Sequence, residues 1–280
     1  MSVAFYIENS YKVSELITNK YSTSFSLATS VLEKEKRKAI YAIYGFVRLA
    51  DEIVDSLHTY DKPFLLAKLN EDLAYAMQNG ISTNLILASF VDTVKKYRIK
   101  KEHIDAFMQS MEYDLTKTNY SETSDLNNYI YGSADVVGLM CLNVFCNGNE
   151  ALYNELEYPA QKLGSAFQKV NFIRDLREDT GDLGRNYFPE ISVDKFSKET
   201  KSLIEKSIQQ DFDEAFTVIK RLPGRSKLAV ALAYYYYLSL FNKIKRASPE
   251  KILSQRIRIS NLIKYLIIIR VGILYKLKFI

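Results

Sequence analysis

Hydrophobic side chains recur every three to four residues along most of the chain, a period that predicts amphipathic α-helices. The stretch 36–57 is a clear case, because it has no proline and one glycine and keeps Ile40, Tyr44 and Val47 on one side. The same period predicts further helices over Phe64–Asn79, Asn84–Tyr97, Lys101–Leu115, Leu126–Cys146, Ala151–Thr180, Lys198–Leu222, Arg225–Ala247 and Ile252–Leu277.

Turn-forming residues separate several of these helices, at 79–80, 147–149, 181–189, 223–224 and 248–249. No Gly/Ser-rich linker and no shift in composition divides the chain. We therefore expect residues 1–280 to form a single all-α domain.

The composition supports a well-packed helical protein and narrows its chemistry. Apolar residues make up 48% of the chain, and only 10 glycines and 5 prolines are present, which disfavours turn-rich β-folds. Cys141 and Cys146 fit neither a disulfide scaffold nor a four-ligand zinc site, and they indicate a reducing compartment. With His58 and His103 as its two histidines, the chain has to use carboxylates for acid, base or metal chemistry.

The charge balance indicates an anionic partner. The net charge is +5 and the pI is near 8.9, which suits phosphates, nucleic acid or an acidic membrane surface. The N-terminal residues lack the basic and long apolar regions of a secretory signal, so we expect a cytoplasmic protein.

The apolar C-terminal segment 262–280 allows two interpretations. Basic residues divide it into runs that are too short to cross a bilayer, at Lys264, Arg270, Lys276 and Lys278. One interpretation is a terminal helix that packs on the core. The other is a basic amphipathic helix in peripheral contact with an anionic membrane, at its cytoplasmic face.

Two carboxylates with the spacing D-x-x-x-D form the first candidate site. Asp51 and Asp55 lie about one helical turn apart on one face. Tyr44 and Arg48 share that face, within about 60°. This stripe continues an apolar line from Ile40, so the carboxylates are predicted to face inward, where unpaired charge is costly and a cation is required. An isolated motif of this kind is more often a solvated acidic turn.

A second helix repeats this spacing at Asp175 and Asp179, with Gln168 and Asn171 on the same face within about 80°. Two acidic faces that converge across a helical bundle form a carboxylate metal site. Oxygen ligands without His or Cys select Mg²⁺ or Mn²⁺, and Mg²⁺ completes its shell with water and substrate phosphate. The implied ligand is therefore a diphosphate or polyphosphate.

Basic residues accompany both motifs and offer bidentate donors for phosphate oxygens, at Arg48, Arg174, Arg177 and Arg185. Arg177 points away from Asp175 on an ideal helix, so a surface salt bridge is the favoured interpretation for this residue. Because these arginines alternate with carboxylates and the other basic residues are spread along the chain, we expect no nucleic-acid binding.

Further motifs accompany the two acidic ones. Together they lie at 22–26 (STSFS), 37–55 (RKAIYAIYGFVRLADEIVD), 129–140 (YIYGSADVVGLM), 163–179 (LGSAFQKVNFIRDLRED), 184–189 (GRNYFP) and 256–260 (RIRIS). This set resembles the head-to-head prenyl synthases, a family that includes phytoene, squalene and dehydrosqualene synthases. The resemblance covers most of the chain. Asp135 departs from the family pattern, which has a small residue there, and this affects the pocket shape more than the reaction class.

The resemblance implies an all-α isoprenoid-synthase helical bundle with a central hydrophobic cavity, at whose mouth both aspartate motifs lie. It implies that five residues bind Mg²⁺ or Mn²⁺: Asp51, Asp55, Asn171, Asp175 and Asp179. The four aspartates among them are also expected to be catalytic. It further implies a catalytic Tyr129 and substrate-binding roles for Ser22, Phe25, Tyr44, Arg48, Ala134, Gly138, Gln168, Asn171, Arg174 and Tyr187. The ring of Phe25 is expected to form the cavity floor and set product length, with an ordinary core position as the alternative.

Within this family the compact length and residues 129–140 favour a phytoene synthase of carotenoid biosynthesis. Such an enzyme joins two geranylgeranyl diphosphates head to head through a cyclopropylcarbinyl diphosphate. The alternative is a squalene or dehydrosqualene synthase that uses farnesyl diphosphate. Squalene formation needs NADPH, whereas phytoene formation needs no reductant, so we do not expect NADPH here. A non-catalytic helical assembly factor is the alternative of another class, and the four intact aspartates argue against it.

Overall fold

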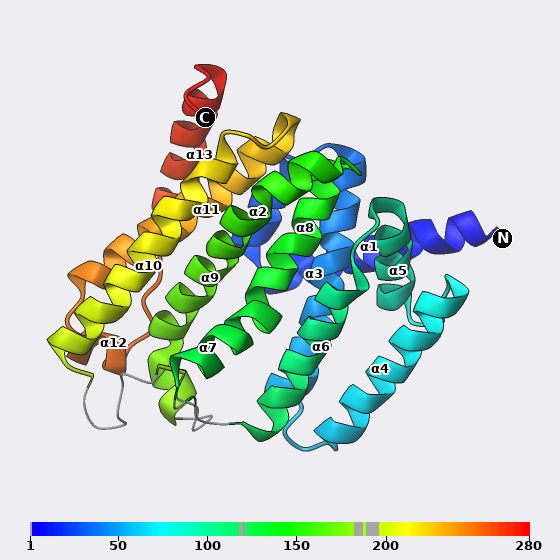
Figure 1. Ribbon diagram of the computed structural model, residues 1–280, viewed down its shortest axis with the longest axis horizontal. Helices are drawn as coiled ribbons and strands as arrows, with labels where there is room; N and C mark the ends of the chain where they lie inside the picture. The colour runs from blue at the N-terminus through cyan, green and yellow to red at the C-terminus, as the bar shows by residue number, and fades with distance from the viewer. Residues whose placement is uncertain (1, 118–119, 121, 182–186, 189–195) are drawn as a thin grey trace.

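The computed structural model describes residues 2–117, 120, 122–181, 187–188 and 196–280. Within these ranges the chain is helical and has no strand, which confirms the all-α prediction (Figure 1). The elements are α1 (Val3–Tyr21), α2 (Thr23–Ser30), α3 (Lys34–Asp55), α4 (Lys62–Asn79), α5 (Leu85–Tyr97), α6 (Lys101–Thr116), α7 (Thr123–Ile130), the π-helical turn η1 (Tyr131–Asp135), α8 (Val136–Cys146), α9 (Glu150–Gly181), α10 (Lys198–Ile219), α11 (Gly224–Arg246), α12 (Pro249–Ser254) and α13 (Asn261–Lys276).

Helices α1 and α2 were not predicted from the sequence. Helix α1 was missed because its buried face is largely polar. Its inner face carries small hydroxyl side chains, Ser14 and Thr18 among them, instead of an apolar stripe. Ser14 Oγ hydrogen-bonds Ser89 Oγ of α5 at 2.8 Å. Helix α2 begins at an N-cap, Ser22, whose Oγ accepts a hydrogen bond from Phe25 N at 3.2 Å.

The prediction of one continuous helix over Ile252–Leu277 is wrong. Helix α12 ends at Ser254, an extended segment follows over 255–260, and α13 begins at Asn261. Ile257 and Ile259 are buried in this segment, while the residues between and beside them are exposed. Burial at every second residue requires extended backbone, because a helix returns to the same face only after about 3.6 residues.

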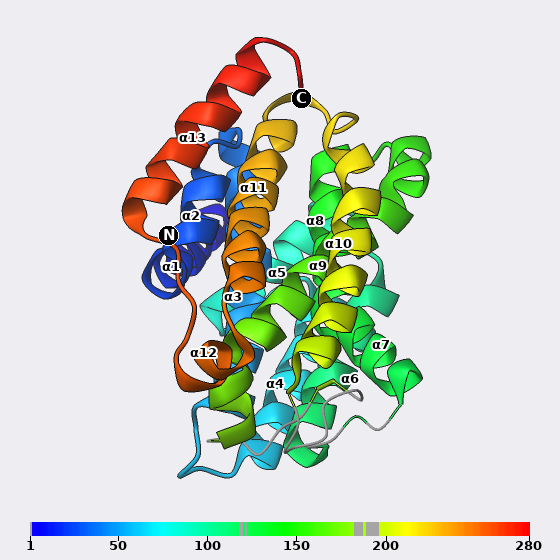
Figure 2. The same ribbon diagram turned by 90° about the vertical axis from the view of Figure 1, so that its left-hand side faces the viewer.

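The helices are arranged so that the acidic motifs reach the same end of the molecule. Figure 1 shows α3, α6 and α9 ending toward its lower end. The motif with Asp51 and Asp55 occupies the last turns of α3, and the motif with Asp175 and Asp179 occupies the last turns of α9. Helix α10 packs along α9, while α13 packs on α11 and lies outside α2 and α11 (Figure 2).

Two apolar clusters stabilise the bundle. One joins α3–α6 with α8 and includes Phe46, whose ring centroid lies 4.1 Å from Phe90 and 5.4 Å from Phe107. The other joins α7 with α9–α13 and includes Phe212 and Phe241, with ring centroids 5.7 Å apart. The cavity described below is lined by residues of both clusters.

The π-helical turn η1 is clamped between two helices by close backbone contact. It interrupts the stretch Thr123–Cys146, which is long and apolar enough for a membrane span but is mostly buried inside the protein, like a core helix. At Gly132 an added Cβ would stand 2.7 Å from the carbonyl oxygen of Ala106 on α6. At Gly164 of α9 it would stand 2.9 Å from the Cα of Asp135. Neither position has room for a side chain.

The clamp at η1 gives a stability prediction. Gly132→Ala is expected to lower the free energy of unfolding by about 1–3 kcal/mol, because the new methyl group pushes η1 away from α6. Gly272→Ala in α13 is the matched control, since nothing lies within 4 Å of the added Cβ. There alanine should raise stability by about 0.5–1 kcal/mol through helix propensity. Urea unfolding followed by circular dichroism measures both effects, and equal effects at the two positions would contradict the packing.

Candidate active site

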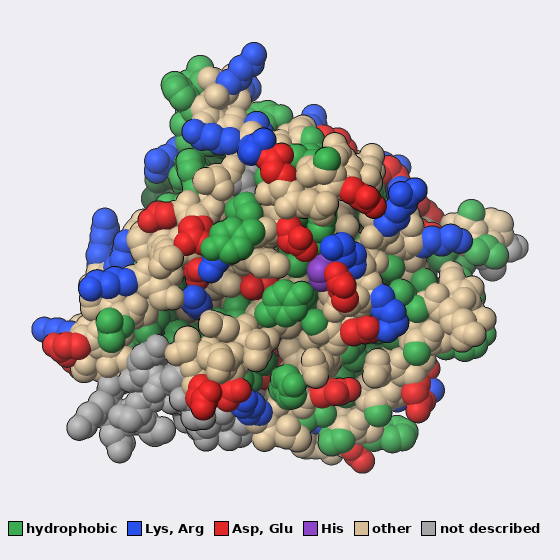
Figure 3. All heavy atoms as spheres, in the orientation of Figure 1, with side chains coloured by type: hydrophobic (Ala, Val, Ile, Leu, Met, Phe, Trp, Pro, Cys, Tyr) green, Lys and Arg blue, Asp and Glu red, His purple; other side chains and the backbone are tan. Residues whose placement is uncertain are grey.

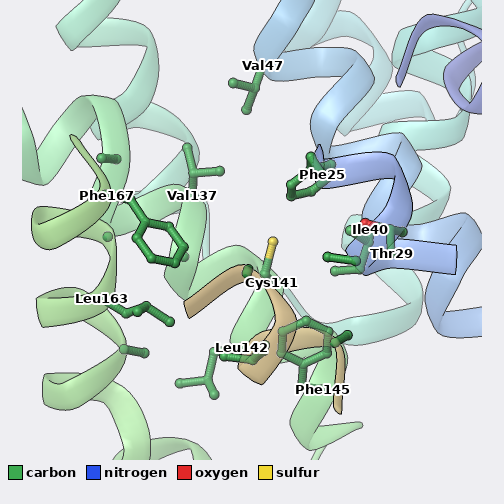
Figure 4. A pocket seen from close by; sticks show the side chains of 18 of the residues that line it. Phe25, Thr29, Ile40, Val47, Val137, Cys141, Leu142, Phe145, Leu163 and Phe167 are labelled. Atoms are coloured by element: carbon green, nitrogen blue, oxygen red, sulfur yellow. The ribbon is translucent and has the colours of Figure 1, made fainter. Parts of the chain in front are cut away.

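An apolar cavity of about 310 Å³ opens between α2, α3, α8, α9 and α11. Carbon atoms make up most of its wall, and Figure 4 shows side chains from several of these helices pointing into it. Small side chains keep the space open at Ala28, Thr29, Ala134, Gly138, Ala160, Gly164, Ala229 and Ala233. Such a space suits an apolar ligand chain.

The cavity has an acidic end and an apolar end. Asp51 lines it one helical turn beyond Val47 on α3, and Figure 4 places Val47 at one extreme. Leu142 and Phe145 of α8 lie at the opposite extreme (Figure 4). The mouth is therefore at the acidic end, and these two apolar side chains close the other end.

Phe25 does not form the cavity floor, contrary to the expectation from the sequence. Its ring lies between the level of Val47 and that of Cys141 (Figure 4). It stacks on Tyr44 with 4.8 Å between the ring centroids. Tyr44 precedes the first aspartate motif by about two turns of α3. This aromatic pair therefore belongs to the wall near the mouth.

The first aspartate motif faces the mouth, as predicted, and a third carboxylate joins it from α6. Burial, together with the charges of Asp55 and Asp114, raises the pKa of Asp51 to about 7. The nearby guanidinium of Arg48 opposes this shift without cancelling it. The carboxylates are thus close enough to repel one another, which a bound cation would relieve.

Arg48 has partners of its own within α1 and α3. It pairs with Glu52 one turn along α3, and its guanidinium lies 4.4 Å from the ring centroid of Tyr21. Its Nε is buried and has no hydrogen-bond partner among the described residues. This unused donor sits beside the mouth, where it suits an anionic ligand.

The second aspartate motif has compensating cations. Arg174 Nε donates to Asp175 Oδ1 at 2.8 Å, and Arg256 Nε of the extended segment lies 2.8 Å from the same oxygen. Burial would lower the pKa of Arg174, but the contact with Asp175 raises it above its ordinary value. Asn171, about one turn earlier on α9, has a buried Oδ1 with no hydrogen-bond partner in the described structure. This oxygen is a ready ligand for a cation or water.

Two tyrosines connect the motifs. Burial raises the pKa of Tyr44, and the charge of Asp51 adds to the shift. Burial also raises the pKa of Tyr237 on α11, where Arg174 opposes the shift and Asp175 adds to it. The two phenols are close enough to influence each other. Tyr237 therefore links the surroundings of the first motif, through Tyr44, with those of Asp175 in the second motif.

Tyr129 lies beside the mouth and outside the cavity lining. Its hydroxyl donates to both carboxylate oxygens of Asp114, at 2.7 and 2.9 Å. Burial raises its pKa well above the ordinary value, and the Asp114 charge adds to the shift, so the phenol stays neutral. Its ring belongs to an aromatic stack with Tyr120, Phe172 and Tyr187, in which the Tyr187 and Phe172 centroids are 4.0 Å apart. The stack fixes Asp114 next to the first motif.

The remaining predicted residues divide by location. Those that line the cavity are Phe25, Ala134, Gly138 and Gln168, together with Cys141, whereas Cys146 is buried with a free thiol. Ser22 caps α2, and Asp179 is half-buried in the last turns of α9. Arg177 donates to the carbonyl oxygen of Ser254 at 2.7 Å and takes no part in the mouth. Arg185 lies outside the described residues.

Asp114 and Tyr237 are the residues of the mouth that sequence reasoning missed. Asp114 is one of four acidic residues on the amphipathic helix α6 and belongs to no quoted motif. Tyr237 closes a run of four tyrosines, 234–237, which cannot all face outward on a helix. The tyrosine run was therefore the sequence feature that could have indicated an inward-facing tyrosine here. Arg256 belongs to the quoted RIRIS motif, but no sequence pattern predicts its pairing with Asp175.

The model of the squalene/phytoene synthase family matches residues 18–262. This chain belongs to the squalene/phytoene synthase family. Chloroplastic phytoene synthase 2 of Zea mays is 29% identical over 248 residues, which cover 81% of this chain and only 60% of the maize protein. The 4,4'-diapophytoene synthase of Staphylococcus haemolyticus is 25% identical over 264 residues, covering 86% of this chain and 89% of that protein. These members of the family are enzymes by name.

Solved structures of the squalene/phytoene synthase family share the fold of this chain. A dehydrosqualene synthase in complex with ligand has a TM-score of 0.84 at 22% identity, covering 96% of this chain and 98% of that one. Squalene synthase HpnC from Alicyclobacillus acidocaldarius has a TM-score of 0.77 at 21% identity, covering 88% and 96%. The expected isoprenoid-synthase bundle is therefore confirmed, while the roles of the individual site residues stay predictions.

The mouth of this family member offers a donor set that fits Mg²⁺. In the part of the chain that the structure describes, no three His, Cys, Asp or Glu side chains enclose an ion by themselves. Mg²⁺ does not need such an enclosure, because it keeps several waters and binds through one or two carboxylates and substrate phosphate. The repulsion at Asp51 and the unpartnered oxygen of Asn171 both suit a hard cation.

Asp135, the departure from the family pattern, shapes the wall behind the cavity. Its neighbour Ala134 lines the cavity, whereas the Asp135 carboxylate accepts hydrogen bonds from Ser165 Oγ of α9, at 2.9 and 3.1 Å. Burial raises the pKa of Asp135 to about 7, although the hydrogen bond from Ser165 and the charge of Lys162 oppose the shift. The family member therefore carries a buried titratable group at η1.

The raised pKa of Asp135 predicts a pH-dependent stability. The folded-state pKa of about 7 lies above the unfolded value of about 3.9, so the folded state binds the extra proton. Its stabilising contribution is lost as the pH rises through about 7. The free energy of unfolding should therefore fall between about pH 4 and 7 more steeply in wild type than in Asp135→Asn, which cannot ionise. Urea unfolding across this range measures both, and parallel curves would refute the assignment.

Proposed function

We propose that this protein joins two molecules of geranylgeranyl diphosphate head to head to form phytoene, through a cyclopropylcarbinyl diphosphate and with Mg²⁺. The observation that carries the proposal is an apolar cavity whose mouth lies between two acidic helical faces with arginines beside them. The cavity suits a long hydrocarbon chain, and the mouth suits its diphosphate. Phytoene synthases among the relatives support the same reaction class.

The mouth residues bind and orient the diphosphates. Arg48 and Arg174 offer guanidinium donors to phosphate oxygens, since each lies next to an aspartate motif. Asp51, Asp55, Asn171, Asp175 and Asp179 would hold Mg²⁺, which supplies positive charge to the departing diphosphate when bound. Tyr129 stays neutral and keeps Asp114 oriented beside the first motif.

The cavity residues guide the carbon chemistry. One allylic diphosphate loses its C–O bond, and its cation forms carbon–carbon bonds with the double bond of the second substrate, with loss of a proton. A second C–O cleavage, rearrangement and proton loss give the linear hydrocarbon, and released diphosphate can accept the protons. The apolar wall keeps water from the cation, and aromatic faces near the mouth, Phe25 and Tyr44, stabilise it.

The alternative substrate is farnesyl diphosphate, as for a squalene or dehydrosqualene synthase. The small side chains along the middle of the cavity, such as Ala28, Thr29 and Gly138, support the longer geranylgeranyl chain. A non-catalytic assembly factor would have no need of four intact aspartates around a cavity. We therefore retain phytoene synthesis as the function to test.

Incubation of the purified protein with each diphosphate tests the function. The reaction contains Mg²⁺ and either farnesyl or geranylgeranyl diphosphate, with and without NADPH, and the hydrocarbon is identified by mass spectrometry. Phytoene from geranylgeranyl diphosphate, without need of NADPH, is expected. If only farnesyl diphosphate gave a product, a C30 hydrocarbon, farnesyl diphosphate would be the substrate. If neither diphosphate gave a product, the proposed head-to-head synthesis would be rejected.

Replacing an aspartate in either motif should abolish most activity but affect stability differently. Asp51→Asn and Asp175→Asn are each expected to lower turnover by orders of magnitude, because both faces hold the cation. Asp51→Asn should keep or raise the melting temperature, since it relieves repulsion, whereas Asp175→Asn loses its contacts with Arg174 and Arg256 and should lower it. Glu71→Gln, an exposed charge change on α4, is the control. Wild-type turnover in either aspartate variant would mean that the motif is only a solvated surface.

The closed end of the cavity should set the preferred chain length. Phe145→Ala deepens that end and should shift a competition between the two diphosphates toward the longer one. Five extra carbons contribute up to roughly 4 kcal/mol when fully buried, which is enough to change the ratio strongly. Phe25→Ala, near the mouth, should slow both substrates with little change in the ratio. The product ratio in a mixed-substrate assay distinguishes the two positions. If only Phe25→Ala shifted the ratio, Phe25 and not Phe145 would limit the chain length.

A further inference from the structure

The outer face of α13 is apolar along its whole length. Five large apolar side chains recur there every three to four residues and fall within about 80° of one another. Each is more than half exposed: Leu262 (69%), Leu266 (55%), Ile269 (59%), Ile273 (52%) and Leu277 (60%). The inner face packs on α11 through Ile267 and Val271, which are buried. Helices on the surface of soluble proteins carry polar side chains outward, so this line requires an apolar partner.

The net positive charge of the chain comes from the same segment. Residues 251–280 contain seven Lys or Arg and no Asp or Glu, whereas the preceding 250 residues contain 31 basic and 33 acidic side chains. Arg270 and Lys276 lie about 20° beyond the two edges of the apolar line. In Figure 3 the upper left, where Figure 1 places α13, carries hydrophobic and basic side chains together. This combination of an apolar line with basic edges matches an anionic interface.

We propose that α13 lies flat in the headgroup region of an anionic lipid bilayer, with its apolar line inserted and its basic side chains among the lipid phosphates. Tyr265 and Phe279 are exposed toward the two ends of the helix, and such aromatic side chains gather at membrane interfaces. The helix has 16 residues, fewer than a span requires, so the contact is peripheral.

A second copy of this chain is a poorer partner for the same surface. A two-fold contact through α13 would bring two copies of residues 261–280 together, each with four cations and no acidic residue. Like charges brought together at an interface oppose association. An anionic bilayer instead presents the opposite charge over the whole surface.

The membrane surface lies next to the wall of the central cavity. Lys264 Nζ of α13 lies 3.4 Å from Thr23 Oγ1 of α2, and a small pocket between α2, α11 and α13 is lined by Leu27 and Ala28 among others. Ala28 also lines the central cavity. Figure 2 shows α13 on the outside of these helices. A bilayer bound to α13 would therefore be separated from the cavity by one layer of helices.

Sedimentation of the full chain with lipid vesicles tests the proposal. Binding to vesicles of phosphatidylcholine with phosphatidylglycerol should exceed binding to phosphatidylcholine alone by roughly tenfold and should weaken at high salt. Replacing the apolar line with Leu266→Gln, Ile269→Gln and Ile273→Gln together should lower binding to the anionic vesicles by roughly tenfold or more. Lys276→Gln with Lys278→Gln, at exposed positions that packing does not need, should remove the preference for the anionic lipid.

Leu203→Gln on α10 is the matched control, because that leucine is 57% exposed but lies outside the C-terminal segment, and it should bind like wild type. Circular dichroism and hydrocarbon synthesis from soluble substrate check that the variants remain folded. Light scattering without lipid should show a monomer. Wild-type protein that stays in the supernatant with anionic vesicles, equal loss in the Leu203 control, or a lipid-free dimer that the triple variant dissociates would each overturn the proposal.

Discussion

An apolar cavity has to stay open inside a close-packed helical bundle, and the packing around it has to compensate for the lost contacts. An empty space in a protein interior loses contacts on all sides, at a cost on the order of several kcal/mol. The surrounding helices offset that loss by packing tightly elsewhere, with backbone contacts at Gly132 and Gly164 and stacked rings around Phe46. At the acidic mouth, Arg174 and Arg256 neutralise Asp175, whereas burial and the neighbouring carboxylates keep the pKa of Asp51 raised.

Most of the fold could be predicted because most helices bury an apolar stripe, and their predicted ends between 36 and 247 differ from the observed ones by three residues or fewer. The failures have physical causes. Helix α1 packs through hydroxyl groups such as Ser14, which a hydrophobic pattern cannot detect. The segment 255–260 alternates exposed polar residues with buried Ile257 and Ile259, a period of two that the apolar residues on either side concealed. The extended backbone there brings Arg256 to Asp175.

The candidate site could be predicted where two aspartates recur with regular spacing on one helix. It could not be predicted where another helix contributes a single residue. The spacing of Asp51 with Asp55 and of Asp175 with Asp179 reveals two inward faces without any structure. Asp114 has no such local pattern, because its place beside the first motif follows from how α6 packs in the bundle. Depth along the cavity is likewise a tertiary property, so the sequence could not show that Phe145 lies farther from Val47 than Phe25 does.

The π-helical turn also determines which side chains of the following helix face the cavity. A π-helix winds more residues into each turn than an α-helix, so η1 shifts the angular phase of everything that follows it. If residues 131–135 kept their number but wound as a regular α-helix, α8 would rotate relative to α7 by roughly the 100° of one residue. Gly138 and Cys141 would then leave the cavity wall while Tyr129 kept its place beside the mouth. The most regular helix that this segment could form is therefore incompatible with the cavity that it helps to build.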